Sequence, residues 1–273
     1  MIQQNAQICS ICNVSEFKLV CEKLEFQYVS CSGCGVVRQY PYPNATIINE
    51  YYKMYVTKKT AKSVYLSDDG FAEFVEGKKF TFKDLGLSEH FFDNKDVLDV
   101  GCGTGQFVNM IQGKVKSVLG IDLSEECIDF AIKRGLNCKK VDFLEIDSRF
   151  DIISMWHLIE HLRSPADFIK HAYKILNPGG TLLIETPAVG SVSYGFGKDW
   201  RFFMPVEHIN LFTQNALFSL ATDCGFSVKS WIRFGSGNDA GTLPPANKRA
   251  MDSIAKQKGF GDIIAVLLIK NEN

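Results

Sequence analysis

A short apolar segment that runs directly into a glycine-rich turn constrains the fold of this chain more than any other feature. Residues 96–100 read Asp-Val-Leu-Asp-Val, residues 101–105 read Gly-Cys-Gly-Thr-Gly, and residues 106–111 have the pattern of a helix. Glycines let a backbone approach a ligand that a Cβ atom would exclude, and the first turn of a helix offers unpaired N–H groups. The segment therefore predicts a strand, turn and helix that bind a nucleotide.

The spacing of the glycines separates two classes of nucleotide cofactor. A dinucleotide fingerprint reads GxGxxG and needs a third glycine where this chain has Gln106. Here the pattern is GxGxG, and Asp99 precedes it. The string Asp-Val-Gly-Cys-Gly-Thr-Gly resembles motif I of class I S-adenosylmethionine-dependent methyltransferases, whose loop lies under the methionine part of the cofactor. The resemblance implies that four residues bind S-adenosylmethionine: Asp99, Gly101, Gly103 and Gly105.

Two acidic residues follow the loop, each at the end of a further predicted strand. Residues 117–121 form a second strand that leads to Asp122, where a carboxylate can accept hydrogen bonds from both hydroxyls of a ribose. Both cofactor classes use such an acid, so Asp122 indicates a nucleoside without choosing between them. A third strand over residues 138–141 leads to Asp142 and Phe143, which resemble the acidic and hydrophobic pair beside the adenine in the same family. A solvated turn carboxylate is the alternative for Asp142.

The fourth predicted strand, residues 150–156, ends in a group of titratable side chains. His157-Leu-Ile-Glu160-His161 follows it, at the edge where ligands bind in open α/β sheets. The string also matches the HxxEH of inverted zinc metalloproteases, but there it lies within a helix, whereas here it closes a strand. The region resembles motif IV of a methyltransferase subgroup that includes ubiquinone-biosynthesis O-methyltransferases and enzymes that modify nucleotide-linked sugars.

Histidines in this region are candidates for a catalytic base. Methyl transfer depends mainly on alignment, and a base is needed when the acceptor must lose a proton. Imidazole suits that task at neutral pH, so we expect His161 to be the base and His157 to be the second candidate. Glu160 is expected to orient a histidine or to bind an acceptor hydroxyl. His208, in the long segment 188–213, is a further candidate, and a purely structural role is the alternative for each histidine.

The rest of the pattern completes a seven-stranded sheet. A helix over 165–176, a turn over 177–180 and a strand over 181–185 precede a helix over 215–224 and strands over 226–234 and 263–270. The family resemblance implies a doubly wound, Rossmann-like α/β sheet with strand order 3-2-1-4-5-7-6 and an antiparallel seventh strand. Residues 93–273 are expected to form this domain. Residues 41–92 are expected to be a linker and helices, whose aromatic residues pack against the domain or cover the substrate.

Four cysteines near the N-terminus predict a separate zinc module over residues 1–40. Cys9 and Cys12 form one CxxC pair, and Cys31 and Cys34 form a second, roughly 18 residues further on, which is the spacing of a zinc ribbon. About 40 residues cannot bury enough surface to fold alone, so the ion would replace a core. Because protein ligands fill all four positions, a structural ion is favoured over a catalytic one. Four unrelated cysteines are the alternative.

Composition and charge narrow the choice of partner and location. The net charge is −1, which gives no general attraction for nucleic acid or an anionic membrane surface. The N-terminus lacks the basic and apolar runs of a signal peptide, and every apolar stretch is too short to span a bilayer. We therefore expect a cytoplasmic protein with a small-molecule acceptor.

The combination of a CxxC ribbon with this domain resembles the sugar methyltransferases of deoxysugar and surface-polysaccharide pathways. Relatives that methylate carbon carry a further C-terminal domain, whereas this sequence ends at strand seven. We therefore expect O-methylation of a hydroxylated acceptor such as a nucleotide-linked or glycan sugar. Two other classes stay open. An NAD-dependent oxidoreductase would need a GxGxxG loop, and a non-catalytic module would bind cofactor without releasing S-adenosylhomocysteine.

Overall fold

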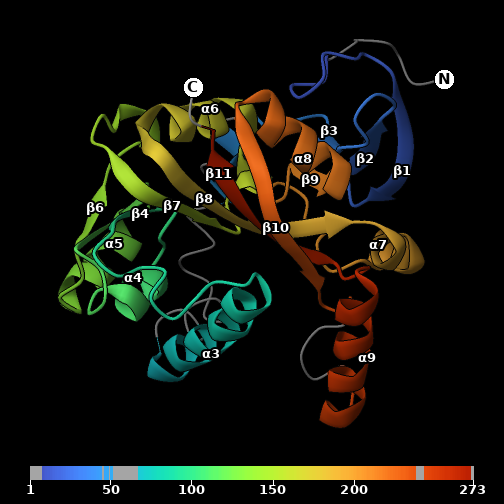
Figure 1. Ribbon diagram of the computed structural model, residues 1–273. Coiled ribbons are helices and arrows are strands. Elements are labelled where there is room, and N and C mark those ends of the chain that lie inside the picture. The colour runs from blue at the N-terminus through green and yellow to red at the C-terminus, as the bar shows by residue number, and fades with distance from the viewer. Residues whose placement is uncertain (1–7, 45, 49, 52–66, 238–242, 272–273) are drawn as a thin grey trace.

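The computed structural model describes residues 8–44, 46–48, 50–51, 67–237 and 243–271. Its centre is a sheet whose strands lie in the order β6-β5-β4-β7-β8-β11-β10 (Figure 1). The strands span Asp96–Val100 (β4), Ser117–Asp122 (β5), Cys138–Lys140 (β6), Phe150–Trp156 (β7), Leu176–Val189 (β8), Phe226–Phe234 (β10) and Ile263–Lys270 (β11). Strands β4 to β8 are parallel, and β11 is antiparallel to both neighbours. The predicted fold and the order 3-2-1-4-5-7-6 are confirmed.

Helices cover both faces of this sheet. Consecutive residues of β4 point to opposite faces, so Val97 and Leu98 join two different core clusters. One cluster contains α3, α4 and α5, and the other contains α6 and α8. The helices span Asp68–Asp84 (α3), Gln106–Ile111 (α4), Glu125–Lys133 (α5), Pro165–Ile175 (α6), Ser191–Phe196 (α7), Gln214–Asp223 (α8) and Pro245–Lys258 (α9).

Strand β8 is longer than the predicted strand over 181–185. Leu176 and Thr181 both pair with β7, and the residues between them form a bulge in the ladder where the sequence indicated a turn. Beyond Glu185, the strand is extended because β11 pairs with it on one side, through Ile263 and Pro187. Strand β9 (Asn210–Thr213) pairs with it on the other side, and this strand lies in the segment that the sequence indicated as a loop.

The N-terminal strands are joined to the main sheet by backbone pairing. Strands β1 (Phe17–Lys23), β2 (Phe26–Cys31) and β3 (Val37–Tyr40) form an antiparallel meander. Strand β3 then pairs with β9, which pairs with β8, so a continuous ladder connects the cysteine-bearing strands to the centre of the fold (Figure 1).

Helix α3 lies between the N-terminal strands and β4 along the chain. Ser67 caps its first turn by accepting a hydrogen bond from the backbone N–H of Gly70, and its own residues Phe71 and Phe82 are buried. Residues 52–66 of the expected linker lie outside the described residues. Within the described part of the chain, no helix has the length and apolar character needed to cross a membrane.

Candidate active site and cysteine cluster

The glycine loop after β4 is held by the backbone of β5 and by Asp122. The N–H groups of Gly101 and Cys102 both donate to the carbonyl of Ile121, at 2.8 and 2.9 Å. One carboxylate oxygen of Asp122 accepts from the Gly103 N–H at 2.9 Å, and the other accepts from the Ser124 N–H at 2.8 Å. The structure therefore brings the predicted loop and the predicted ribose acid into direct contact.

The backbone of Gly103 leaves room for a ligand. Its φ of +52° favours glycine, and a Cβ atom added there would meet nothing within 4 Å. A side chain at this position would therefore fill open space beside the loop rather than collide with the fold. Such a gap beside a glycine loop at the start of a helix is suited to a nucleoside cofactor.

The other predicted cofactor residues support the loop from beneath or flank it. Asp99 is buried and accepts a hydrogen bond from the Ser154 hydroxyl at 2.7 Å, which ties β4 to β7. Burial raises the pKa of its carboxyl to about 7. Asp142 caps the short helix η1 (Phe143–Glu145), and the Phe143 ring is buried against Phe168 at 5.3 Å. Phe143 therefore anchors this turn from the core side.

Four side chains of alternating charge, Glu185 of β8 among them, lie side by side near the C-terminal end of β7. His157 is at φ +50°, and its Nδ1 lies 3.1 Å from Glu160 Oε1 while its Nε2 lies 3.3 Å from Glu185 Oε1. The Lys78 ammonium of α3 binds the same Glu185 oxygen at 2.6 Å. A strained backbone at a half-buried histidine between two buried carboxylates is typical of functional sites.

The charges of Lys78, Glu185, His157 and Glu160 stabilise one another. Burial alone would lower the pKa of the His157 imidazole, but its contacts with Glu160 and Glu185 raise it to about 9. Burial alone would raise the pKa of both carboxyls, but the cations around them lower each to about 2. His157 therefore carries its proton at neutral pH, and both glutamates are ionised.

His161 and His208 come together next to Glu160. Their rings meet edge to face with centroids 4.9 Å apart. His161 Nδ1 lies 2.8 Å from the carbonyl of Glu207, and His208 Nδ1 lies 2.9 Å from the carbonyl of Phe202. Burial lowers the pKa of His208 to about 4, so its imidazole is neutral at pH 7. One candidate ligand atom of Glu160 and one of each of the two histidines lie within 4.8 Å of one another, close enough to bind one cation.

Sequence reasoning missed two residues of this region, Lys78 and Glu185. Lys78 lies on α3, 107 residues before Glu185, which it binds. Glu185 and Trp156 are register partners across β8 and β7, and the Lys78 ammonium lies 4.0 Å above the Trp156 ring. The sequence offered one signal for Glu185: it is a glutamate that directly follows three apolar residues of a predicted buried strand. The buried atoms Glu185 Oε2 and Trp156 Nε1 have no hydrogen-bond partner among the described residues.

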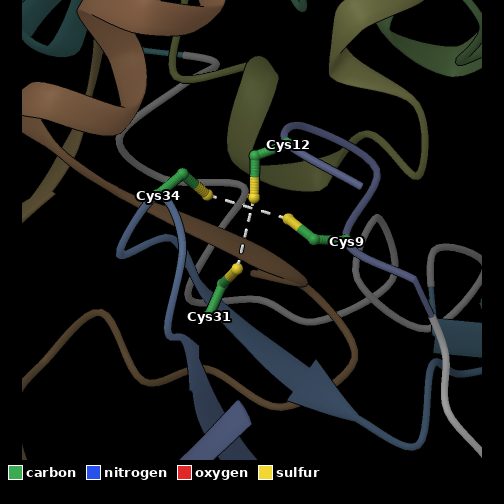
Figure 2. Close-up of side chains that lie close together, drawn as sticks. All are labelled: Cys9, Cys12, Cys31 and Cys34. Atoms are coloured by element: carbon green, nitrogen blue, oxygen red, sulfur yellow. Dashed lines mark hydrogen bonds between the residues drawn. The ribbon is translucent and has the colours of Figure 1, made fainter. Parts of the chain in front are cut away.

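The four N-terminal cysteines converge on one point (Figure 2). The Cys9 and Cys34 sulfurs are 3.7 Å apart and those of Cys12 and Cys31 are 3.4 Å apart. A tetrahedral zinc ion with Zn–S bonds of about 2.3 Å separates its sulfur ligands by about 3.8 Å. A Cβ atom on Gly33 would lie only 2.9 Å from the Cys12 sulfur, so glycine keeps this cradle open. The donor set and its spacing fit zinc.

The sheet order, the glycine loop and Asp122 define a nucleotide-binding α/β protein with methyltransferase topology. A family model described as a methyltransferase domain matches residues 71–230, which is more than half of the chain. The chain therefore belongs to the methyltransferase domain family.

Among curated proteins, the ubiquinone biosynthesis O-methyltransferase of Coxiella burnetii (strain RSA 493 / Nine Mile phase I) is similar to this chain. The two are 36% identical over 101 residues, which cover 34% of this chain and 43% of the relative. The match therefore spans less than half of the relative's length.

Solved structures show the same fold. An S-adenosylmethionine-dependent methyltransferase from Archaeoglobus fulgidus has a TM-score of 0.53 at 21% identity, over 72% of this chain and 94% of its own. The [4+2]-cyclase SpnF also has a TM-score of 0.53, at 18% identity, over 73% of this chain and 81% of its own. Because one of these is named as a cyclase, the fold alone does not define the reaction, and the site must.

Proposed function

We propose that this chain transfers the methyl group of S-adenosylmethionine to a hydroxyl group of a small acceptor, such as a nucleotide-linked or glycan-bound sugar. One observation carries the proposal. The glycine loop follows β4, and Glu160 and His161 follow its neighbour β7 at the same edge of the sheet, where His208 lies beside them. A nucleoside held by the loop can thus present its reacting end to these side chains.

The cofactor half of the site would be built as follows. The loop backbone lies under the methionine part, the Asp122 carboxylate accepts from the ribose hydroxyls, and Asp142 lies on the adenine side. Bound S-adenosylmethionine supplies an electrophilic methyl group. Asp99 does not need to touch it, because its bond to Ser154 already holds the ends of β4 and β7 together.

The acceptor half would remove a proton from the acceptor hydroxyl, and a hydrogen bond would orient the imidazole that takes it. The Nδ1–H of His161 donates to the Glu207 carbonyl, which fixes the tautomer whose lone pair is on Nε2. His161 is then the general base, and the Glu160 carboxylate stabilises the imidazolium that forms. Burial keeps His208 neutral and makes it a weaker base than an ordinary histidine, so it would contact the substrate rather than take the proton. His157 carries a proton already and acts as a fixed positive charge.

Unused hydrogen-bonding capacity favours a hydroxylated acceptor. Glu185 Oε2 is an acceptor and Trp156 Nε1 is a donor, they come from directly paired strand residues, and neither has a partner among the described residues. A hydroxyl group can donate to the first and accept from the second. If an acceptor hydroxyl reaches both groups, it removes the cost of leaving them unsatisfied, roughly 1–3 kcal/mol for each.

Binding and turnover test this function in order. Isothermal titration should show binding of S-adenosylmethionine and none of NADH; the reverse result would indicate an oxidoreductase. Release of S-adenosylhomocysteine is then measured with a panel of nucleotide-linked deoxysugars. Cofactor binding without release on any acceptor would instead support a non-catalytic module.

His161→Gln tests the proposed base. It should lower kcat by about 10²- to 10⁴-fold and leave cofactor affinity unchanged, because it removes the base but no cofactor contact. His90→Gln is the control, since His90 lies in the exposed turn before β4 and pairs only with Glu89 and Asp93 among the described residues. Equal turnover in both variants would contradict the role of His161.

We also propose that the four cysteines bind one structural zinc ion and that residues 1–40 fold around it. The four converging sulfurs and the space left by Gly33 support this assignment. Mass spectrometry of the purified chain should find one zinc per chain. Cys31→Ser should lose the ion, whereas Cys21→Ser should retain it, because Cys21 is outside the cluster. Full zinc content in Cys31→Ser would contradict the assignment.

A further inference from the structure

The turn that carries Glu207 and His208 has a strained backbone. Val206 adopts φ +74°, a conformation that is costly for a β-branched residue unless the surrounding structure enforces it. The two residues that follow it, Glu207 and His208, belong to the proposed site. Something must therefore hold this turn in shape.

Gln39 of β3 holds both ends of the turn. Its side chain is fully buried, and Oε1 accepts a hydrogen bond from the Val206 N–H at 2.6 Å. Its own backbone N–H donates to the Ile209 carbonyl at 3.0 Å. Gln39 thus makes hydrogen bonds to the backbone on either side of Glu207 and His208.

Neighbours of Gln39 reinforce these contacts. Tyr28 is the register partner of Gln39 on β2, its hydroxyl donates to the His208 carbonyl at 3.5 Å, and its ring lies 4.5 Å from Phe203. Tyr42 donates to Asn210 at 2.9 Å. The N-terminal strands and the residues just after them contact the turn at several points.

The opposite side of the turn contacts the histidine segment. The Ile209 N–H donates to the Glu160 carbonyl at 2.9 Å, and the Glu207 carbonyl is the partner of His161 Nδ1 at 2.8 Å. The turn therefore lies between strands β2 and β3 on one side and the η2 segment (Ile159–His161) on the other. Any shift of Val206 is transmitted to the distance between His208 and His161.

We propose that Gln39 is a positioning residue of the acceptor site: through Val206 it fixes the turn that presents Glu207 and His208 to His161. Strands β2 and β3 then support one side of the active site and are not an independent recognition module. The catalytic consequence rests on the function proposed above, whereas the ordering of the turn does not.

The test replaces Gln39 by a side chain of similar volume that cannot accept a hydrogen bond. In Gln39→Met, amide hydrogen exchange over residues 204–210 should rise at least about 10-fold, while zinc content and S-adenosylhomocysteine affinity stay within about twofold of the native chain. Displacement of the turn should lower kcat by about 10- to 100-fold with KM for S-adenosylmethionine unchanged. Gln27→Met, on the neighbouring strand β2, is the matched control and should change none of these, because the Gln27 side chain donates to the exposed Glu22 instead of the turn.

A second variant isolates the link through Val206. Glycine adopts φ +74° without strain, so Gln39→Met combined with Val206→Gly should return exchange over 204–210 and kcat most of the way to native values. Unchanged exchange in Gln39→Met, or no recovery in the double variant, overturns the proposal. Exchange that rises equally across β1 to β3 would also overturn the proposal, as would failure of both variants to fold. Either result would give Gln39 a general structural role.

The two proposals fail in distinguishable ways. If the native chain transfers no methyl group, the exchange measurements still decide whether Gln39 orders the turn. If transfer occurs and Gln39→Met leaves both exchange and kcat unchanged, the function stands and the positioning role is wrong.

Discussion

The two halves of the site are built by different parts of the polypeptide. The cofactor half uses backbone N–H groups of one glycine loop and a carboxylate from the next strand, so it comes from a short stretch of sequence. The acceptor half uses side chains from α3, β8, the η2 segment and the turn before β9, and β3 holds that turn.

This difference determines how each half tolerates change. A backbone-built pocket depends on conformation, which glycine and hydrogen bonds within the loop provide locally. A pocket built from buried charges depends on every partner being present, because one unpaired charge in the interior is costly. Loss of a partner should therefore destabilise the acceptor half, whereas substitution in the cofactor half should mainly weaken ligand binding.

Lys78→Met should have the largest effect on stability. It removes the cation that pairs with the buried Glu185 and keeps the length of the side chain, so the free energy of unfolding should fall by about 3–5 kcal/mol. Chemical denaturation measures the change. Lys79→Met is the control, because its pair with Glu76 is exposed and should contribute less than about 0.5 kcal/mol. Similar losses in both variants would contradict the account of the acceptor half.

Asp122→Asn tests the cofactor half. It removes a charged acceptor for the ribose hydroxyls, so S-adenosylhomocysteine affinity should fall by about 10- to 100-fold, with a smaller loss of stability. Titration calorimetry of the folded variant measures the affinity. Asp129→Asn, on the exposed face of α5, should bind like the native chain. If Asp122→Asn bound normally, the loop would not hold a nucleoside in the proposed way.

The pH dependence of stability gives the smallest predicted effect. The pKa of His157 is raised from 6.5 to about 9 in the folded chain, so its proton stabilises the fold fully below pH 6.5 and this contribution is lost as pH rises toward 9. Since the ring is partly exposed, we expect a loss on the order of 1–2 kcal/mol. The difference in unfolding free energy between the native chain and His157→Gln should shrink over this range. A constant difference would contradict the charged state of His157.

The cofactor half and the core strands could be predicted from the sequence because their signals are local. The helix after Gly105 and the strands Phe226–Phe234 and Ile263–Lys270 have the predicted bounds. Each follows from alternating or continuous apolar residues bounded by glycine or polar turns. The four cysteines, which the structure brings together, were visible in the same way.

The acceptor half could not be predicted in full because it depends on contacts between distant segments. Strand β9 consists of Asn210–Thr213, too short to show a period, and it exists because β3 and β8 pair with it. Lys78 reads as an ordinary lysine of an amphipathic helix until Glu185 is placed opposite it. The strained backbone at Val206 and the hydrogen bond to Gln39 that holds it have no signature in either local sequence.

A crystal structure of the chain with S-adenosylhomocysteine tests most directly whether the two halves meet at one reacting centre. The account predicts the ribose hydroxyls within hydrogen-bonding distance of Asp122 and the sulfur atom directed toward His161 and His208. A nucleoside bound away from the loop, or a sulfur atom that points away from both histidines, would contradict it.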